Sequence, residues 1–175
     1  PADVEVDVVV LGLGPGGEHV AIKLARAGLD VLGVEDRLVG GECPYYGCVP
    51  SKMMIAAAHV VAAAQKVSDF GGTATVEPDW SEVARRVRDE ATDDWDDTVA
   101  VKRLEDSGAR FHRGRGVLDG PGRVRVGGTT YVARKGVVLN TGTRPAAPPI
   151  DGLEGTPYWT NRDAVTVTDL PASLV

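Results

Sequence analysis

A run of glycines directly after a short apolar segment constrains this chain more than any other feature. Residues 6–11 (VDVVVL) are rich in β-branched side chains, as is typical of a strand buried in a parallel sheet. Residues 12–17 (GLGPGG) follow, and residues 18–27 carry apolar side chains at helical spacing up to a capping Gly28. Residues 31–35 (VLGVE) are apolar again. This order predicts a β–α–β unit at the start of a Rossmann-like, doubly wound parallel α/β sheet.

Gly12, Gly14 and Gly17 match the pattern G-x-G-x-x-G of dinucleotide-binding turns. Glycines allow the tight turn, the approach of a pyrophosphate and close packing of helix on strand, while the helix directs free N–H groups at the phosphates. Glu35 ends the second predicted strand, where a carboxylate accepts hydrogen bonds from ribose hydroxyls and repels a 2′-phosphate. The pattern therefore favours FAD or NAD over NADP. The alternative is an ordinary α/β turn with a solvated Glu35.

The rest of the chain continues the α/β pattern. We predict helices over residues 53–66 and 80–106, the second with its acidic residues 93–97 on a solvated face. Strands over 110–118, 123–126 and 129–133 form a small antiparallel meander (about 110–135), whose arginines face solvent, and 137–140 is a further buried strand. We divide the chain into a binding domain over residues 1–150 and a linker over 151–175.

The composition narrows the class of partner. The formal net charge is −6, which disfavours nucleic acid and anionic membranes as partners. By inspection no apolar run approaches the ~20 residues that a membrane span needs. The two cysteines are too few for the disulfide framework of a small secreted protein, so we expect a cytoplasmic protein.

Cys43 and Cys48 are five positions apart, with Lys52 shortly after them. N–H groups at the start of the following helix and the Lys52 ammonium would stabilise a thiolate. Two such thiols can pass two electrons to a partner by disulfide exchange. Zinc is a poor alternative because no second pair of ligands follows. A purely structural disulfide remains an alternative.

The segment 40–52 (GGECPYYGCVPSK) resembles the redox-active disulfide motif of the pyridine nucleotide–disulfide oxidoreductases, whose usual form is GGTCxNxGC[IV]PSK. This family of flavin enzymes includes dihydrolipoamide dehydrogenase, glutathione reductase and mercuric reductase. The glycine turn with Glu35 and the later segment 141–145 (TGTRP) match the family in type and order. The resemblance extends from Val6 to the end of the chain.

The resemblance implies roles for individual residues. Cys48 would be the charge-transfer thiol beside the flavin, Cys43 the interchange thiol that attacks the substrate, and Lys52 a neighbour of the flavin N5. The implied FAD-binding residues are Gly12, Gly14, Gly17, Glu35, Gly41, Lys52, Gly116, Thr141 and Gly142. Gly116 would direct backbone groups toward the adenine, and Thr141 and Gly142 would line the flavin crevice.

Three departures from the family motif bear on the electron acceptor. Glu42 replaces the usual Thr before the first cysteine, and a carboxylate close to Cys43 would make that thiol a slower nucleophile. Residues 44–46 (PYY) replace a small or Asn-containing insert, and Asn140 replaces a small apolar residue before Thr141.

The resemblance implies an FAD-dependent NAD(P)H:disulfide oxidoreductase, homodimeric at full length, which reduces a small disulfide or a metal ion. Family members are longer, so we expect this chain to be a fragment, with residues 151–175 leading toward an NAD(P)-binding domain. We expect the isolated piece to be inactive and to bind FAD weakly or not at all. Two alternatives remain: another FAD enzyme (monooxygenase or NADH dehydrogenase type) with non-catalytic cysteines, or a stand-alone nucleotide-binding or redox-sensing module.

Overall fold

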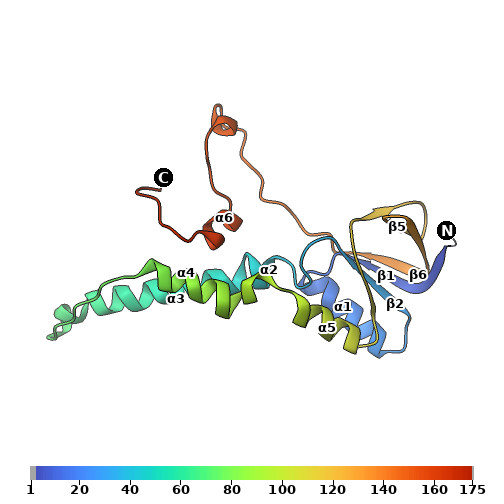
Figure 1. The fold of residues 1–175 in the computed structure, drawn as a ribbon, viewed down its shortest axis with the longest axis horizontal. Helices are drawn as coiled ribbons and strands as arrows, with labels where there is room; N and C mark the ends of the chain where they lie inside the picture. The colour runs from blue at the N-terminus through green and yellow to red at the C-terminus, as the bar shows by residue number, and fades with distance from the viewer. Residues whose placement is uncertain (1–2, 175) are drawn as a thin grey trace. The chain divides into compact units, whose positions relative to one another are not determined.

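The computed structural model describes residues 3–174, which form two compact units (Figure 1). The first unit consists of residues 1–43 and 96–143, and the second of residues 44–95 and 144–175. The division follows contacts between residues, and each unit is made of two separate stretches of the sequence. The predicted domain boundary at residue 150 stays a prediction.

The first unit is built on one six-stranded sheet with the strand order β3-β2-β1-β6-β5-β4. Strands β3, β2, β1 and β6 are parallel, while β5 and β4 continue the sheet as antiparallel strands. The strands are β1 (Val4–Leu11), β2 (Val31–Glu35), β3 (Arg110–Arg113), β4 (Gly116–Leu118), β5 (Arg123–Val126) and β6 (Thr129–Leu139). The predicted α/β class with a parallel sheet and a β-meander is confirmed.

Two strand predictions are wrong. Arg110–Arg113 is not part of the meander, because it pairs in parallel with β2 (Leu32 opposite Arg110) at the sheet edge. The two predicted strands around residues 129–140 are one strand, β6. β6 pairs with β5 through its first residues (Val126 opposite Thr129) and with β1 along most of its length. Leu139, expected to be buried, is exposed.

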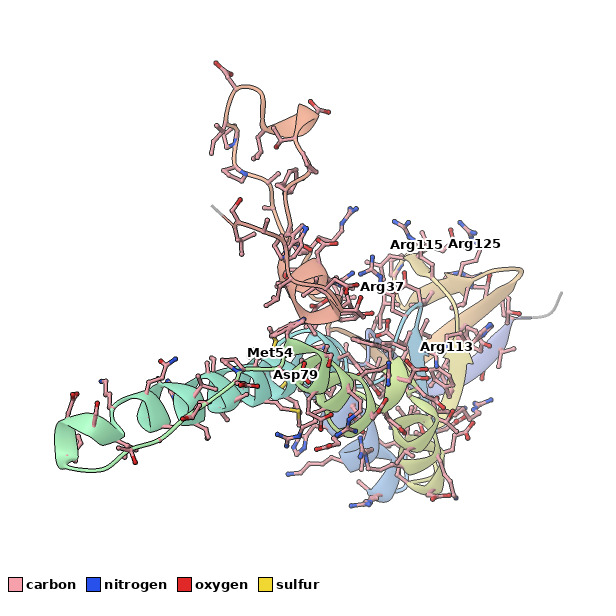
Figure 2. All side chains as sticks on the ribbon, turned by 60° about the vertical axis from the view of Figure 1, so that its left-hand side comes forward. Arg37, Met54, Asp79, Arg113, Arg115 and Arg125 are labelled. Atoms are coloured by element: carbon pink, nitrogen blue, oxygen red, sulfur yellow. The ribbon has the colours of Figure 1, made fainter. Side chains whose placement is uncertain are left out.

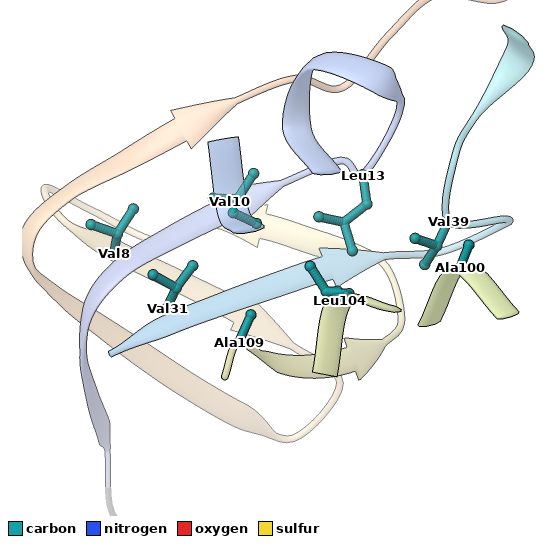
Figure 3. Packing of buried hydrophobic residues seen from close by; sticks show 9 residues of the cluster. Val8, Val10, Leu13, Val31, Val39, Ala100, Leu104 and Ala109 are labelled. Atoms are coloured by element: carbon teal, nitrogen blue, oxygen red, sulfur yellow. The ribbon is translucent and has the colours of Figure 1, made fainter. Parts of the chain in front are cut away.

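Alternate residues of β1 enter two different clusters, as the period of a strand requires. Val8 and Val10 pack with residues of the helices α1 (Pro15–Arg26) and α5 (Thr98–Asp106), which lie along one face of the sheet (Figures 1 and 3). Val9 and Leu11 pack on the other face with residues of β2 and β5. Burial on both faces explains why residues 6–11 read as a continuous apolar run.

The predicted helix over residues 80–106 is broken in the middle. The structure has α4 (Trp80–Arg86), a π-helical turn η2 (Val87–Ala91), a 3₁₀ turn η3 (Asp93–Trp95) and then α5. Asp93, Asp94 and Trp95 all have left-handed backbone conformations, with φ between 51° and 56°. The buried Thr92 ends the π-helical turn, since its hydroxyl donates to the carbonyl oxygens of Val87 and Arg88.

The second unit contains α3 (Cys48–Gln65), η1 (Val67–Phe70), α4, η2, η3, η4 (Leu153–Gly155) and α6 (Asn161–Thr166). A four-residue helix, α2 (Glu42–Tyr45), precedes α3. The predicted helix over residues 53–66 is confirmed and begins five residues earlier, at Cys48.

One segment of the described chain, Glu42–Gln65, is long and apolar enough to cross a membrane by length and composition alone. Our expectation that no run approaches this length is therefore wrong, because its alanines and valines raise the mean hydropathy to 1.4 despite scattered polar residues. Only 6% of the apolar window is buried. A single helix of this kind is weak evidence, because core helices of soluble proteins pass the same test.

We predict that Leu104→Ala lowers the free energy of unfolding by about 2–4 kcal/mol. The Leu104 side chain is fully buried between α5 and the sheet (Figure 3), so its removal leaves a cavity. Val99→Ala on the same helix is the control, because Val99 is exposed and its truncation should cost less than about 0.5 kcal/mol. Urea unfolding of both variants measures the difference, and equal costs would contradict this packing.

Candidate nucleotide-binding turn and dithiol segment

The glycine turn between β1 and α1 brings backbone segments closer than side chains would allow. Gly12 has φ = +91°, and a Cβ atom there would lie 2.2 Å from the carbonyl oxygen of Asn140. A Cβ atom at Gly17 would lie 2.0 Å from the carbonyl oxygen of Gly12. Both contacts are with backbone atoms that cannot move aside, so the positions require glycine. This is the geometry in which a helix N-terminus comes close to a bound pyrophosphate.

Glu35 is held over this turn by backbone amides. One carboxylate oxygen accepts a hydrogen bond from the Leu13 N–H at 2.8 Å, and the other accepts one from the Arg37 N–H at 2.9 Å. A carboxylate has about four lone-pair sites, so both oxygens keep capacity for two ribose hydroxyls. The carboxylate is thus oriented, which the alternative of a solvated side chain did not predict.

The loop that leads to the first cysteine packs on the same turn. Gly41 has φ = +67°, and a Cβ atom there would lie 2.7 Å from the Cα of Gly14. The Gly40 N–H donates to the carbonyl oxygen of Leu13 at 2.7 Å. Gly41, one of the predicted FAD-binding residues, therefore packs directly on the glycine turn.

Asn140 lies against the glycines of the turn. Its Nδ2 lies 3.4 Å from the Gly12 carbonyl oxygen and 3.3 Å from the position of a Cβ at Gly14. The Cα of Thr141 lies 3.1 Å from the Cβ position at Gly12, so this predicted residue also reaches the turn. Gly142 follows it in a left-handed conformation, with φ = +67°. The substitution at Asn140 thus places an amide at the turn.

Glu18 and Arg103 form an ion pair beside the turn that sequence analysis missed. Glu18 is buried in the first turn of α1, and its Oε1 accepts from the Arg103 Nε at 2.7 Å. An unpaired carboxylate there would repel a pyrophosphate, and the guanidinium cancels this charge. The two residues are 85 positions apart, so no local pattern marks the pair.

Asp97 links α5 to the loop after β2, so the predicted solvated acidic face is wrong for this residue, while Asp93, Asp94 and Asp96 are exposed as predicted. Its buried carboxylate accepts from the Val39 N–H at 2.6 Å and from the Arg113 Nη2 at 2.6 Å. Arg113 also donates to the carbonyl oxygen of Arg37. Arg115 and Arg125 are exposed, as expected (Figure 2).

Gly116 has a packing role that is independent of any nucleotide. A Cβ atom there would lie 2.2 Å from the Leu11 Cδ1 and 3.3 Å from methyl groups of Val34 and Val124. A contact between its backbone and an adenine stays a prediction.

The cysteines lie on two consecutive helices. Cys43 is half-buried within α2, and Cys48 is exposed as the first residue of α3. No side chain caps the N-terminus of α3. Lys52 is exposed in the same helix. Cys43 belongs to the first unit, and Cys48 and Lys52 belong to the second.

The residues of the first unit fit the adenosine diphosphate part of FAD. The glycine backbone of the turn, an α1 N-terminus that no side chain caps and an oriented Glu35 carboxylate meet at one edge of the sheet, with the Asn140 amide against the glycines. These groups match pyrophosphate oxygens and ribose hydroxyls.

Comparison with known protein families shows which family the chain belongs to. Residues 6–175 match the family model described as pyridine nucleotide-disulphide oxidoreductase. This chain belongs to that family. The predicted family is thereby confirmed.

Within the oxidoreductase family the chain is similar to several named proteins. It is 32% identical to a mercuric reductase of Acidithiobacillus ferrooxidans, over 97% of this chain and 32% of that protein. It is 33% identical to a dihydrolipoyl dehydrogenase of Acholeplasma laidlawii, over 98% of this chain and 52% of that protein. The solved HOCl-induced flavoprotein disulfide reductase RclA from Escherichia coli superposes with a TM-score of 0.73 at 25% identity, over 94% of this chain and 35% of that chain.

We predict that Gly17→Ala lowers the free energy of unfolding by about 2 kcal/mol or more. The new methyl group would meet the backbone oxygen of Gly12, so α1 must move away from β1. Gly128→Ala is the control, since a Cβ there meets nothing within 4 Å. Chemical denaturation compares the two variants, and a Gly17→Ala protein as stable as the control would refute the close approach.

Proposed function

We propose that this chain is the FAD-binding part of an NAD(P)H-dependent flavoprotein disulfide reductase. In the proposed enzyme the Cys43–Cys48 pair passes electrons to a small disulfide or a metal ion. The observation that carries the proposal is the family's cysteine motif placed at the start of α3, directly after a loop packed on the dinucleotide turn. The chain spans from about a third to about a half of the length of the relatives it matches, so the activity of the whole protein is a proposal.

The first unit would hold the nucleotide. Gly12, Gly14 and Gly17 leave room for the pyrophosphate, Glu35 would accept from the ribose hydroxyls, and Arg103 would screen Glu18. Bound FAD would supply the two-electron chemistry that connects a nicotinamide hydride to a disulfide. Because part of the flavin site would come from outside this chain, we propose that the isolated piece binds FAD weakly and is inactive.

The two thiols would perform the exchange with the substrate. The Cys43 thiolate attacks one sulfur of a substrate disulfide, which forms a mixed disulfide and releases the other sulfur as a thiolate. The Cys48 thiolate then attacks the Cys43 sulfur, which closes the Cys43–Cys48 disulfide and releases the second substrate thiolate. The substrate gains two electrons and the protein loses two.

The decisive experiment is a reductive titration of the full-length flavoprotein. A disulfide reductase takes up two electrons beyond those of the flavin and develops a long-wavelength thiolate-to-flavin charge-transfer band. We predict that Cys48→Ser abolishes this band and that Cys43→Ser retains it. A band that survives in Cys48→Ser would show that the two thiol roles are assigned wrongly. Uptake of only the flavin's own electrons by the wild type would reject the function.

We predict that Glu35→Gln weakens the binding of ADP to the full-length apoprotein about tenfold, because hydrogen bonds to a charged acceptor are replaced by neutral ones. The same substitution should improve the relative binding of 2′-phosphorylated ADP, since the repelling charge is gone. Calorimetry with both nucleotides measures the ratio. Asp151→Asn, in the segment outside the first unit, is the control and should change neither affinity. An unchanged preference in Glu35→Gln would place the ribose elsewhere.

A further inference from the structure

The segment between the two cysteines contains a short hinge. α2 ends at Tyr45 and α3 begins at Cys48, so Tyr46 and Gly47 are the non-helical residues that separate the helices. Each cysteine lies on one of these helices, Cys43 in α2 and Cys48 at the start of α3. Both hinge residues belong to the second unit and lie between the two cysteines in the sequence.

Four contacts within the second unit hold the hinge. The Tyr46 ring stacks on the Trp95 ring, with centroids 6.3 Å apart and planes 26° from parallel. The Trp95 indole N–H donates to the carbonyl oxygen of Tyr45 at 3.1 Å. The Arg162 guanidinium lies 5.0 Å from the centroid of the Tyr46 ring, and the Asn161 amide donates to the Tyr46 carbonyl oxygen at 3.0 Å. The ring of Tyr46 thus contacts Trp95 and Arg162, and its backbone carbonyl accepts a hydrogen bond from Asn161.

The elements that supply these contacts have a specific local structure. Trp95 ends three consecutive left-handed residues, an unusual conformation for residues other than glycine. Asn161 and Arg162 open α6, whose start is fixed by a capping box between Thr160 and Asp163. The Thr160 hydroxyl and N–H lower the pKa of the Asp163 carboxyl, as expected for a carboxylate held in such a box. The residues that contact the hinge, Trp95 on one element and Asn161 and Arg162 on another, therefore lie on backbone of restricted conformation.

We propose that Trp95, Asn161 and Arg162 are positioning residues that hold Tyr46 and thereby set the thiol–disulfide equilibrium of the Cys43–Cys48 pair. An ordered hinge reduces the entropy lost when the six-residue ring closes, which raises the effective concentration of one thiol toward the other. Closure forms the S–S bond, breaks both S–H bonds and transfers two electrons and two protons to a disulfide oxidant, which becomes two thiols. This inference rests on the proposed function, because it requires the pair to cycle between dithiol and disulfide.

The test compares Tyr46→Leu with Tyr46→Phe in the full-length protein. Each protein is equilibrated with mixtures of glutathione disulfide and glutathione, where one glutathione disulfide becomes two glutathione molecules for each protein disulfide formed. Trapped samples are quantified by mass spectrometry. Tyr46→Leu should lower the equilibrium constant for disulfide formation about fivefold or more, because it loses both the stack and the cation–π contact. Tyr46→Phe keeps both contacts and should stay within about twofold of the wild type.

Two further variants keep the test decisive. Tyr158→Leu removes an exposed tyrosine of the same unit and should leave the equilibrium unchanged. Trp95→Phe keeps an aromatic ring but loses the indole donor to Tyr45, and should give an intermediate decrease. If Tyr46→Leu does not fold, the Trp95→Phe variant provides the test in its place.

The outcomes separate the two proposals. A wild-type protein that forms no Cys43–Cys48 disulfide in excess glutathione disulfide would reject the proposed function. A wild type that forms it, with Tyr46→Leu and Trp95→Phe at the same equilibrium constant or a higher one, would reject the positioning role alone.

Discussion

Contact between backbone atoms at the glycine turn is the constraint on which the first unit depends. α1 can pack on β1 and β2 only because Gly17 presents no side chain to the Gly12 carbonyl, and Gly12 presents none to Asn140. This approach places the α1 N-terminus at the edge of the sheet, where Leu13 binds the Glu35 carboxylate. The loop bearing Gly41 then packs on the same backbone, so the chain reaches Cys43 from a fixed starting point.

Two buried carboxylates of the first unit are each paired with an arginine. Glu18 would oppose a pyrophosphate and is paired with Arg103, while Asp97 is paired with Arg113 and with a backbone amide. Both arginines come from the later part of the sequence, on α5 and β3. The return of the chain to the first unit after residue 95 therefore supplies charge balance as well as strands.

In the second unit the segment between the cysteines is held by contacts from distant parts of the sequence. Aromatic stacking, a cation–π contact and two hydrogen bonds converge on Tyr45 and Tyr46, which belong to one of the three departures from the family motif. The residues that contact these tyrosines are Trp95 of η3 and Asn161 and Arg162 of α6.

The sequence by itself determined the features that are encoded locally. The β–α–β unit, the glycine turn, the Gly28 cap and the cysteine motif were all predicted, because short-range periodicity and backbone freedom mark them within a few residues. Tertiary structure alone decided the break at Asp93–Trp95, the parallel pairing of β3 and the contacts of Asn140. It also decided which arginine pairs with Glu18. These features rest on partners far apart in the chain, and their energy comes from contacts that no local pattern records.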